Sequence, residues 1–380
     1  MNNTFQLSGF KCFRDETFDL KNLTVLTGSN GTGKSSLIQA ILLIRLAIEK
    51  NALNSDNSSY SSEEWRRSPT PLNLGYELSL GTVNDIFNEN DSKDSKLTKI
   101  TLALDKETFE VPLPDEEDDD TSVNIILKEP SFNKANIPFW RKKEFYYLYT
   151  ERFGPRLALP FNYTDFVHCG HRGEFTAQVL LKNDFLKVQG ARFFPDLKSE
   201  NLPLQVDAWL DSICPGTSVK VEALGTMSAQ IKLRNNSVKN HVLATNIGFG
   251  ISYSLPIIVT GLIAKSDSVF IVENPEAHLH PKGQSNMGYF LGKVAASGVK
   301  VIIETHSEHI INGIRRAALS TSDLSIDDIN IYFFNGFEKE KESIIPIRIE
   351  ANGDLSDFPV DFFDQARQDL LEILNLSKRN

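Results

Sequence analysis

The stretch Gly28-Ser29-Asn30-Gly31-Thr32-Gly33-Lys34-Ser35 carries the strongest signal in this sequence, because it fits G-x-x-x-x-G-K-[ST] at every fixed position. Glycines in this pattern let backbone N–H groups turn inward around phosphates. The lysine brings a positive charge to the β- and γ-phosphates, and the serine hydroxyl suits Mg²⁺. The pattern therefore predicts a site for a nucleoside triphosphate with magnesium.

The segments on either side agree with that prediction. The apolar run 23–27 is expected to form a buried strand, and 36–44 follows with the composition of a helix. A helix that begins here points its N-terminus at the bound anion. The sequence thus predicts a strand, a phosphate-binding loop and a helix in that order.

Composition narrows the function classes. The 380 residues are 41% hydrophobic and 24% charged, as in an ordinary globular protein, and no apolar run reaches the roughly 20 residues of a membrane-spanning helix. The three cysteines are scattered, and the N-terminus has no signal-peptide pattern, so we expect a cytoplasmic protein without a membrane partner. The net charge of −10 argues against a surface coated in basic residues for nucleic acid.

The rest of the chain predicts an α/β fold. Strand-like segments that recur before residue 130 suggest an antiparallel side sheet, while the alternation of strands and helices after residue 246 predicts a parallel sheet. A polar segment at 51–70 is expected to be a long loop. The expected strands are 74–80, 97–104, 123–128, 219–224, 227–233, 268–272 and 299–303. The expected helices cover 174–186, 204–213 and 246–264, and two more begin near Lys282 and Ser307.

Three segments in the C-terminal half carry candidate site residues. The apolar strand 269–272 ends at Glu273, as in the Walker-B arrangement that delivers a carboxylate to Mg²⁺. Gly248, Gly250 and Ser252 open an apolar helix and offer a second anion site at its N-terminus. His306 follows strand 299–303, where its side chain can contact a γ-phosphate.

These motifs, in this order, resemble the ABC-type ATPase heads of SMC, RecF and OLD-like proteins. Within that group the sequence is most similar to stand-alone ATPases of bacterial antiphage systems of the Septu- and retron-associated type. The stretches 273–281 and 303–307 carry the likeness, and 353–365 resembles the small C-terminal domain of unknown function in this group. Asn30 is typical of the branch.

The resemblance implies an ATPase with ATP and Mg²⁺ as cofactors. It implies catalytic roles for Glu273, Glu276 and His306, with Ser35 and Glu273 at the metal. The second copy in a head-to-tail homodimer, or a higher homo-oligomer, would cap the γ-phosphate. The residues that the resemblance assigns to ATP are Gly28, Asn30, Gly31, Gly33, Lys34, Ser35 and Ser36, together with Gly248, Gly250 and Ser252 of the second copy.

One departure from the family pattern affects catalysis. Asn274 occupies the position of the usual catalytic glutamate, and an amide cannot act as a general base. Either Glu276 or Glu304 replaces it, or hydrolysis is slow and ATP serves as a clamp between two heads. Arg152 and Arg172 are equally compatible with phosphate contacts and with structural ion pairs.

The fold class that follows is an ABC-type P-loop ATPase head with a mixed, largely parallel sheet, an antiparallel side sheet, a helical insertion and a small C-terminal segment. The resemblance further suggests a sensor, scaffold or switch of an antiphage complex that controls a separate effector, a nuclease encoded nearby. The predicted divisions are 1–130 for the first half of the head, 131–245 for the insertion, 246–336 for the second half and 337–380 for the C-terminal domain.

Two other functions remain open at this stage. A RecF-like repair or recombination ATPase would bind DNA directly through a local basic groove. Alternatively, the chain itself could be a metal-dependent nuclease, since four of its seven histidines lie within 278–309, among Glu273, Glu276 and Glu304.

Overall fold

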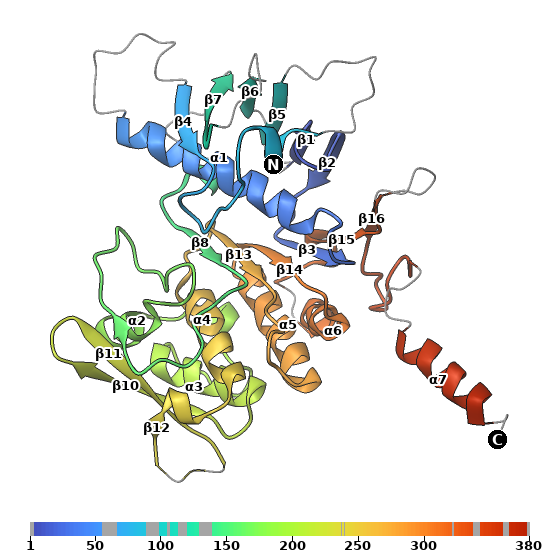
Figure 1. Ribbon diagram of the computed structural model, residues 1–380. Coiled ribbons are helices and arrows are strands. Elements are labelled where there is room, and N and C mark those ends of the chain that lie inside the picture. The colour runs from blue at the N-terminus through green and yellow to red at the C-terminus, as the bar shows by residue number, and fades with distance from the viewer. Residues whose placement is uncertain are drawn as a thin grey trace.

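Three β-sheets organise the protein, with the helices packed between and beneath them (Figure 1). The long helix α1, Lys34–Asn54, lies between an N-terminal antiparallel sheet and a central mixed sheet. The computed structural model describes residues 4–54, 67–88, 99–104, 107–112, 120–128, 139–236, 238, 240–320, 323–336, 343–359 and 365–377.

The central sheet has the strand order β16-β15-β3-β14-β13-β8. Its strands run parallel except β16, which pairs antiparallel with β15. This order places β14 between the strand that precedes the phosphate loop and the strand that ends at Glu273. The bounds are β3 Leu23–Gly28, β8 Phe145–Leu148, β13 Val269–Glu273, β14 Lys300–Glu304, β15 Ile329–Phe334 and β16 Ile344–Ile347.

Alternate side chains of the central strands enter two different hydrophobic cores, as the two-residue repeat of a strand requires. On β8, Phe145 and Tyr147 join the core around α1, whereas Tyr146 and Leu148 join the core beneath the sheet. All four are buried, since both faces of the sheet are covered. β8 lies within the range expected for the insertion, yet it forms an edge strand of the central sheet.

The N-terminal sheet is antiparallel, with the order β2-β1-β5-β6-β7-β4. The prediction of a strand at 74–80 was wrong, because Tyr76 and Glu77 take positive φ angles of 50° and 55° that break an extended chain. The bounds are β1 Thr4–Ser8, β2 Asp15–Asp19, β4 Arg67–Pro71, β5 Lys99–Leu104, β6 Glu107–Pro112 and β7 Ser122–Lys128.

Helix α1 is longer than the predicted 36–44 and is fixed in the middle by a buried arginine. Arg45 donates hydrogen bonds to the carbonyl oxygens of Trp140 and Lys142 at 2.8 and 2.6 Å, which ties α1 to the segment that enters β8. The expected loop at 51–70 therefore begins as helix and ends in β4; residues 55–66 lie outside the described residues.

Helices α4, α5 and α6 pack beneath the central sheet (Figure 1). The approach of α5 to α6 depends on glycine: a Cβ at Gly288 would lie 2.0 Å from the Ile310 carbonyl oxygen, and one at Gly313 would lie 2.0 Å from that of Ser285. This close contact sets the loops at the N-terminal ends of the two helices side by side. The bounds are α4 Phe249–Ile263, α5 Pro281–Ala296 and α6 Glu308–Ser320.

A third, antiparallel sheet lies beside these helices. Its order is β10-β11-β12, with β9 also pairing with β11. The predicted helix at 174–186 is shorter in the structure, where short loops and a 3₁₀ turn follow α2. The bounds are α2 Thr176–Lys182, α3 Leu202–Ile213, β9 Leu159–Pro160, β10 Ser218–Leu224, β11 Ser228–Arg234 and β12 Val242–Leu243.

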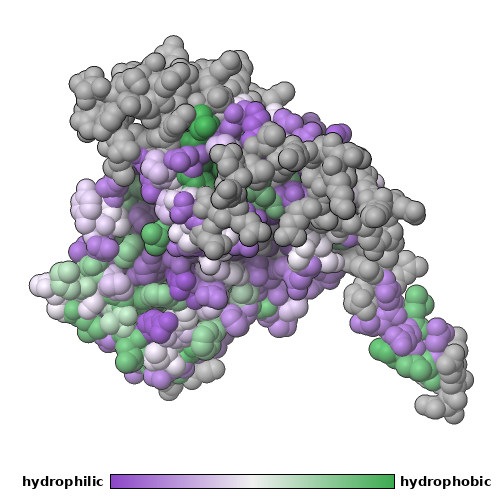
Figure 2. All heavy atoms as spheres, turned by 45° about the horizontal axis from the view of Figure 1, so that its top comes forward, coloured by the Kyte–Doolittle hydropathy of each residue, from purple (hydrophilic) through white to green (hydrophobic). Residues whose placement is uncertain are grey.

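The C-terminal helix α7, Gln365–Ser377, stands apart from the body in Figure 1. Figure 2 shows apolar and polar residues mixed on its surface. Leu370, Leu371, Ile373, Leu374 and Leu376 are each about half exposed. The residues Phe362-Phe363-Asp364, which contributed to the resemblance, lie outside the described residues. Within the described chain, every helix is too short or too polar to cross a membrane.

Candidate functional site

The phosphate loop joins β3 to α1 in the conformation that its glycines allow. Gly28, Gly31 and Gly33 have φ angles of 127°, 73° and 104°, a region that other residues rarely adopt. A Cβ at Gly28 would also lie 2.3 Å from the Phe334 carbonyl oxygen on β15. Asn30 and Gly31 at the tip are exposed. The loop is therefore specified by local backbone geometry and by the neighbouring strand.

Lys34 turns back into the loop from the first residue of α1. Its side chain is 3% exposed, and its ammonium donates hydrogen bonds to the carbonyl oxygens of Gly28, at 3.0 Å, and of Ser29. Burial lowers the pKa of this ammonium, and the negative charge of Glu304 opposes the shift. A positive charge is thus held inside the loop, where phosphate oxygens would replace the backbone carbonyls as partners.

Two carboxylates lie side by side next to this loop. Glu273 ends β13 and Glu304 ends β14, and the two residues are direct partners in the parallel register. Ser35 Oγ donates to both carboxylate oxygens of Glu304, at 2.9 and 3.2 Å. Strand order explains the contact, because β14 pairs with β3 while β13 lies one strand further away. The carboxylate nearest to Ser35 is therefore that of Glu304.

The charges at this edge are poorly solvated. Glu273 and Glu304 are 6% and 5% exposed. Burial, together with the neighbouring charge of Glu304, raises the pKa of Glu273 to about 7, and burial raises the pKa of Glu304 as well. One hydroxyl and two carboxylates are oxygen donors of the kind that Mg²⁺ prefers, and a divalent cation would offset the repulsion between the carboxylates. The donor set fits the expected cofactor.

A tyrosine on β8 and an arginine in the loop after it support the end of the Glu273 strand. The Tyr147 hydroxyl donates to Glu273 Oε1 at 2.8 Å. Arg152 is 3% exposed and donates to the carbonyl oxygens of Glu273 and Asn274 at 2.6 and 2.7 Å, and to that of Tyr253 at 3.1 Å. Its guanidinium therefore bonds to backbone carbonyl oxygens, a structural contact that differs from both the phosphate contact and the ion pair considered from the sequence. Arg172 pairs with Glu77 at 2.6 Å.

Glu276 is held against the end of the neighbouring strand. Its carboxylate accepts hydrogen bonds from Thr305 Oγ1 and from the His306 backbone N–H, both at 2.8 Å. The His306 side chain is exposed, and partial desolvation together with the Lys34 charge lowers the pKa of its imidazole. Glu276 and His306 thus belong to one loop pair beside Lys34, and His306 is neutral near pH 7.

The segment with Gly248, Gly250 and Ser252 packs against the loop that contains His278. Gly248 caps α4, and a Cβ at Gly250 would lie 2.5 Å from the His278 carbonyl oxygen. The Tyr253 ring meets the His278 ring edge to face at 4.7 Å. In the described residues, the close packing contacts of this segment are with the 274–280 loop and with Phe153 and Gly154, and not with the phosphate loop.

The structure thus divides the residues predicted for the site into two groups. The first group lies around the phosphate loop and includes Lys34, Ser35, Ser36, Glu273, Glu276 and His306. The second group consists of Gly248, Gly250 and Ser252 and lies at the N-terminal end of α4. Glu304 was considered only as an alternative base, although the pattern of an apolar strand followed by an acid occurs at 300–304 as at 269–273. Tyr147 was missed, and its place follows from the strand order.

The histidine cluster considered for a metal nuclease is not assembled. Among the described residues, no three His, Cys, Asp or Glu side chains come together to hold a metal ion. His280 instead caps α5 by accepting from the Lys282 N–H, and His278 packs on Phe249 and Tyr253.

The chain has the fold of an ABC-type P-loop ATPase head. The family model described as AAA ATPase domain matches residues 1–157 and 197–311, more than half of the chain, so the protein belongs to this family. A second model, described as a protein of unknown function (DUF3696), matches residues 324–373. No curated protein matches the sequence significantly.

Solved structures with a similar fold are SMC heads. The crystal structure of the Smc head bound to the C-winged helix domain of ScpA has a TM-score of 0.51 at 10% identity and covers 92% of this chain and 98% of its own. The Smc head with an extended coiled coil, bound to the C-terminal domain of ScpA from Pyrococcus furiosus, has a TM-score of 0.47 at 11% identity, with coverage of 98% and 99%. The SMC head domain from Thermotoga maritima has a TM-score of 0.42 at 11% identity, with coverage of 92% and 99%.

Proposed function

We propose that the chain is an ATP-driven switch: it binds ATP with Mg²⁺ at the phosphate loop and uses the bound nucleotide to join two copies. The observation that carries this proposal is the cluster at the carboxyl ends of β3, β14 and β13. It combines the enclosed ammonium of Lys34, the Ser35 hydroxyl, and the adjacent carboxylates of Glu273 and Glu304.

Each residue of this cluster has a distinct task in nucleotide binding. The N–H groups of Gly31 to Ser36 and the Lys34 ammonium hold the β- and γ-phosphates. Ser35, Glu304 and Glu273 would hold the metal with their side-chain oxygens. Mg²⁺ supplies positive charge that offsets the charge on the phosphates. Arg152 and Tyr147 keep the Glu273 strand end in place by hydrogen bonds.

The second anion site supports a dimer. Gly248, Gly250 and Ser252 lie at the N-terminus of a fifteen-residue helix, yet in the described structure their close contacts lead away from the phosphate loop of the same chain. The N-terminus of such a helix attracts an anion. The γ-phosphate bound by a second copy fits this end, so ATP that touches both copies favours the dimer by mass action.

We assign the role of general base in a slow hydrolysis to Glu276. Its carboxylate lies on the same loop pair as His306, and Asn274 has no group that takes a proton. His306 contacts the γ-phosphate from the neighbouring strand end. The Glu276 carboxylate already accepts two hydrogen bonds, from Thr305 Oγ1 and from the His306 N–H.

The switch serves a cytoplasmic antiphage complex in which a separate effector, a nuclease encoded nearby, is controlled by the nucleotide state. The resemblance of the sequence to ATPases of such systems supports this step. The half-exposed leucines and isoleucine of α7 favour a protein partner, because exposed apolar side chains grouped on one helix are typical of interaction sites.

The test is purification from the native source with ATP and Mg²⁺, followed by mass spectrometry of the proteins that elute in stoichiometric amounts. The proposal expects a nuclease whose recovery requires ATP and fails with Lys34→Ala. The pair Leu371→Asp and Leu374→Asp is expected to lose the nuclease while ATP binding persists. Recovery of DNA with the chain alone would contradict the switch and support a RecF-like function.

A further inference from the structure

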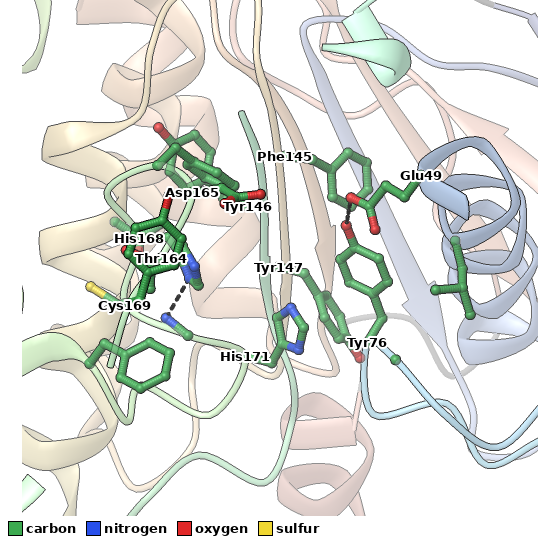
Figure 3. Close-up of a pocket in the computed structure, with 17 residues that line it drawn as sticks. Glu49, Tyr76, Phe145, Tyr146, Tyr147, Thr164, Asp165, His168, Cys169 and His171 are labelled. Carbon is green, nitrogen blue, oxygen red and sulfur yellow. Dashed lines mark hydrogen bonds between the residues drawn. The ribbon is translucent and has the colours of Figure 1, made fainter. Parts of the chain in front are cut away.

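A cavity of about 410 Å³ opens beside the free edge of β8, on the far side of the central sheet from β16. Residues of α1, of the loop around Tyr76, of β8 and of the loop 163–171 line it (Figure 3). Its volume is that of a pocket for a small molecule or for one large side chain. None of the residues assigned to ATP lines it.

Aromatic rings form most of the wall. In Figure 3, Tyr76, Phe145, Tyr147 and His171 lie on the α1 side of β8, and Tyr146 lies on the other side. The rings of Tyr76 and His171 stack with centroids 4.9 Å apart, and Phe145 meets Tyr76 edge to face at 5.6 Å. Packed rings of this kind form a rigid surface whose faces carry partial negative charge.

The charged groups of the cavity are acidic. Glu49 and Asp165 line it, and no lysine or arginine is found among its described lining residues. Glu49 is already engaged by Arg45 and by the Tyr76 hydroxyl, at 2.8 and 2.5 Å. Asp165 is exposed at the rim. Burial lowers the pKa values of His168 and His171, so both imidazoles are neutral near pH 7. An anionic ligand would meet repulsion here.

We propose that this cavity binds an organic cation, an alkylammonium or guanidinium group, with the aromatic rings facing it and Asp165 as its counter-charge. Arg45 does not line the cavity, but its guanidinium lies 5.0 Å from the centroid of the Phe145 ring and pairs with Glu49, so the carboxylate left for a ligand is that of Asp165. Aromatic rings beside a carboxylate are the elements of cation recognition in proteins. The cation belongs either to a free small molecule or to a basic side chain of a partner protein.

The cavity is connected to the nucleotide site by one side chain. The Tyr147 ring lines the cavity, and its hydroxyl donates to Glu273 Oε1 at 2.8 Å. The Tyr149 N–H at the end of β8 bonds to the His171 carbonyl oxygen at 2.8 Å. An occupant that shifts Tyr147 therefore acts on Glu273. This regulatory part rests on the proposed role of Glu273, whereas cation binding does not.

Calorimetry without nucleotide tests the binding. The probes are N-acetylarginine amide and spermidine, and the neutral control is N-acetylcitrulline amide, which has nearly the shape of the arginine compound. We expect the cationic probes to bind at least about tenfold more tightly than the control, and Asp165→Asn to abolish the difference. Asp184→Asn, an exposed aspartate outside the cavity, should change nothing.

Comparing free cations with arginine in a peptide tells whether the natural ligand is a small molecule or a side chain of a partner protein. Tight binding of free spermidine or the arginine amide identifies a small molecule; binding only of arginine within an extended peptide identifies a partner protein. Equal affinity for the citrulline control, unchanged binding by Asp165→Asn, or no binding of any probe overturns the proposal.

Regulation is tested separately with Tyr147→Phe, which keeps the ring and removes the hydroxyl. Cation binding should persist while the effect of the cation on ATP turnover disappears. A cation effect that survives in Tyr147→Phe excludes this route. The two proposals can fail separately. If the unmodified chain does not bind ATP, the proposed function is wrong. The cation site would still stand if the cationic probes bind, as they should also to Lys34→Ala.

Discussion

The phosphate loop and the segment before α4 both lie at the N-terminal end of a helix, but the chain surrounds the two ends differently. Around the loop, Lys34, Ser35, Glu273 and Glu304 come together from three neighbouring strand ends. Around the α4 end, the described chain offers the His278 loop and aromatic rings, with no comparable carboxylate pair or buried lysine. In the proposed function the loop supplies the metal and phosphate contacts of one copy, and the α4 end of a second copy completes the site, which is the structural argument for a dimer.

Lys34→Ala should have the largest effect, because it removes the only buried charge inside the phosphate loop. Losing a charge-assisted contact worth about 2–3 kcal/mol should weaken ATP binding by roughly 100-fold. Equilibrium binding of a fluorescent ATP analogue measures this. Lys50→Ala on the same helix is the control and should bind as the unmodified chain does. Undiminished binding by Lys34→Ala would mean that the loop is not the nucleotide site.

Glu276→Gln should lower turnover by about 100-fold without weakening ATP binding, if Glu276 is the general base. The amide keeps the size of the side chain and can still accept from Thr305 Oγ1. Steady-state phosphate release gives the rate, and Glu308→Gln in the first turn of α6 is the control. Unchanged turnover would show that Glu276 is not the general base and that it only holds the His306 loop in place by hydrogen bonds.

Ser252→Arg separates the two anion sites. A bulky side chain at the start of α4 should displace the γ-phosphate bound by the second copy and so weaken the ATP-bridged dimer. The ATP affinity of the single chain should stay within about twofold, since the phosphate loop is untouched. Sedimentation with ATP and Mg²⁺ measures the dimer. Asp184→Arg is the control for added charge, and Ser252→Ala is the milder variant should the arginine disturb folding.

Glu273→Gln should have the smallest of these effects, and it is measured as the stability of the chain without nucleotide. The pKa of Glu273 is raised to about 7, so the folded chain holds this proton more tightly than the unfolded chain. The resulting stabilisation is present below pH 4.5 and is lost as the pH rises towards 7. The variant should therefore be more stable than the native chain at pH 8, by about 1–3 kcal/mol without nucleotide, and equal to it near pH 4.5. Denaturant titrations at the two pH values test this, and a difference that does not depend on pH would contradict it.

The same two regions show what local sequence can predict. The strand, loop and helix around Lys34 were confirmed, because glycine geometry and apolar runs act within a few residues of one another. A strand at 299–303 was also predicted and is observed as β14, Lys300–Glu304, but the contact of its last residue with Ser35 was not predicted, since that contact depends on β14 lying next to β3. Strand order is set by packing of the whole sheet and leaves no local pattern.

Errors in the N-terminal sheet have a related cause. The segment 74–80 alternates like a strand, yet Gly75 and Tyr76 turn there beneath Leu46 of α1. The strand β6, Glu107–Pro112, was missed because charged residues interrupt its apolar positions. The roles assigned to Glu276, His306 and Ser252 remain predictions.

The most direct test of the central claim, that two copies build one ATP site between them, is a mixing experiment with Lys34→Ala and Ser252→Arg. Each variant alone should be inactive. In an equal mixture, mixed dimers hold one site with an intact loop from one copy and an intact α4 end from the other, so about a quarter of the native ATPase rate should return. A mixture that stays inactive while both variants fold would contradict the account.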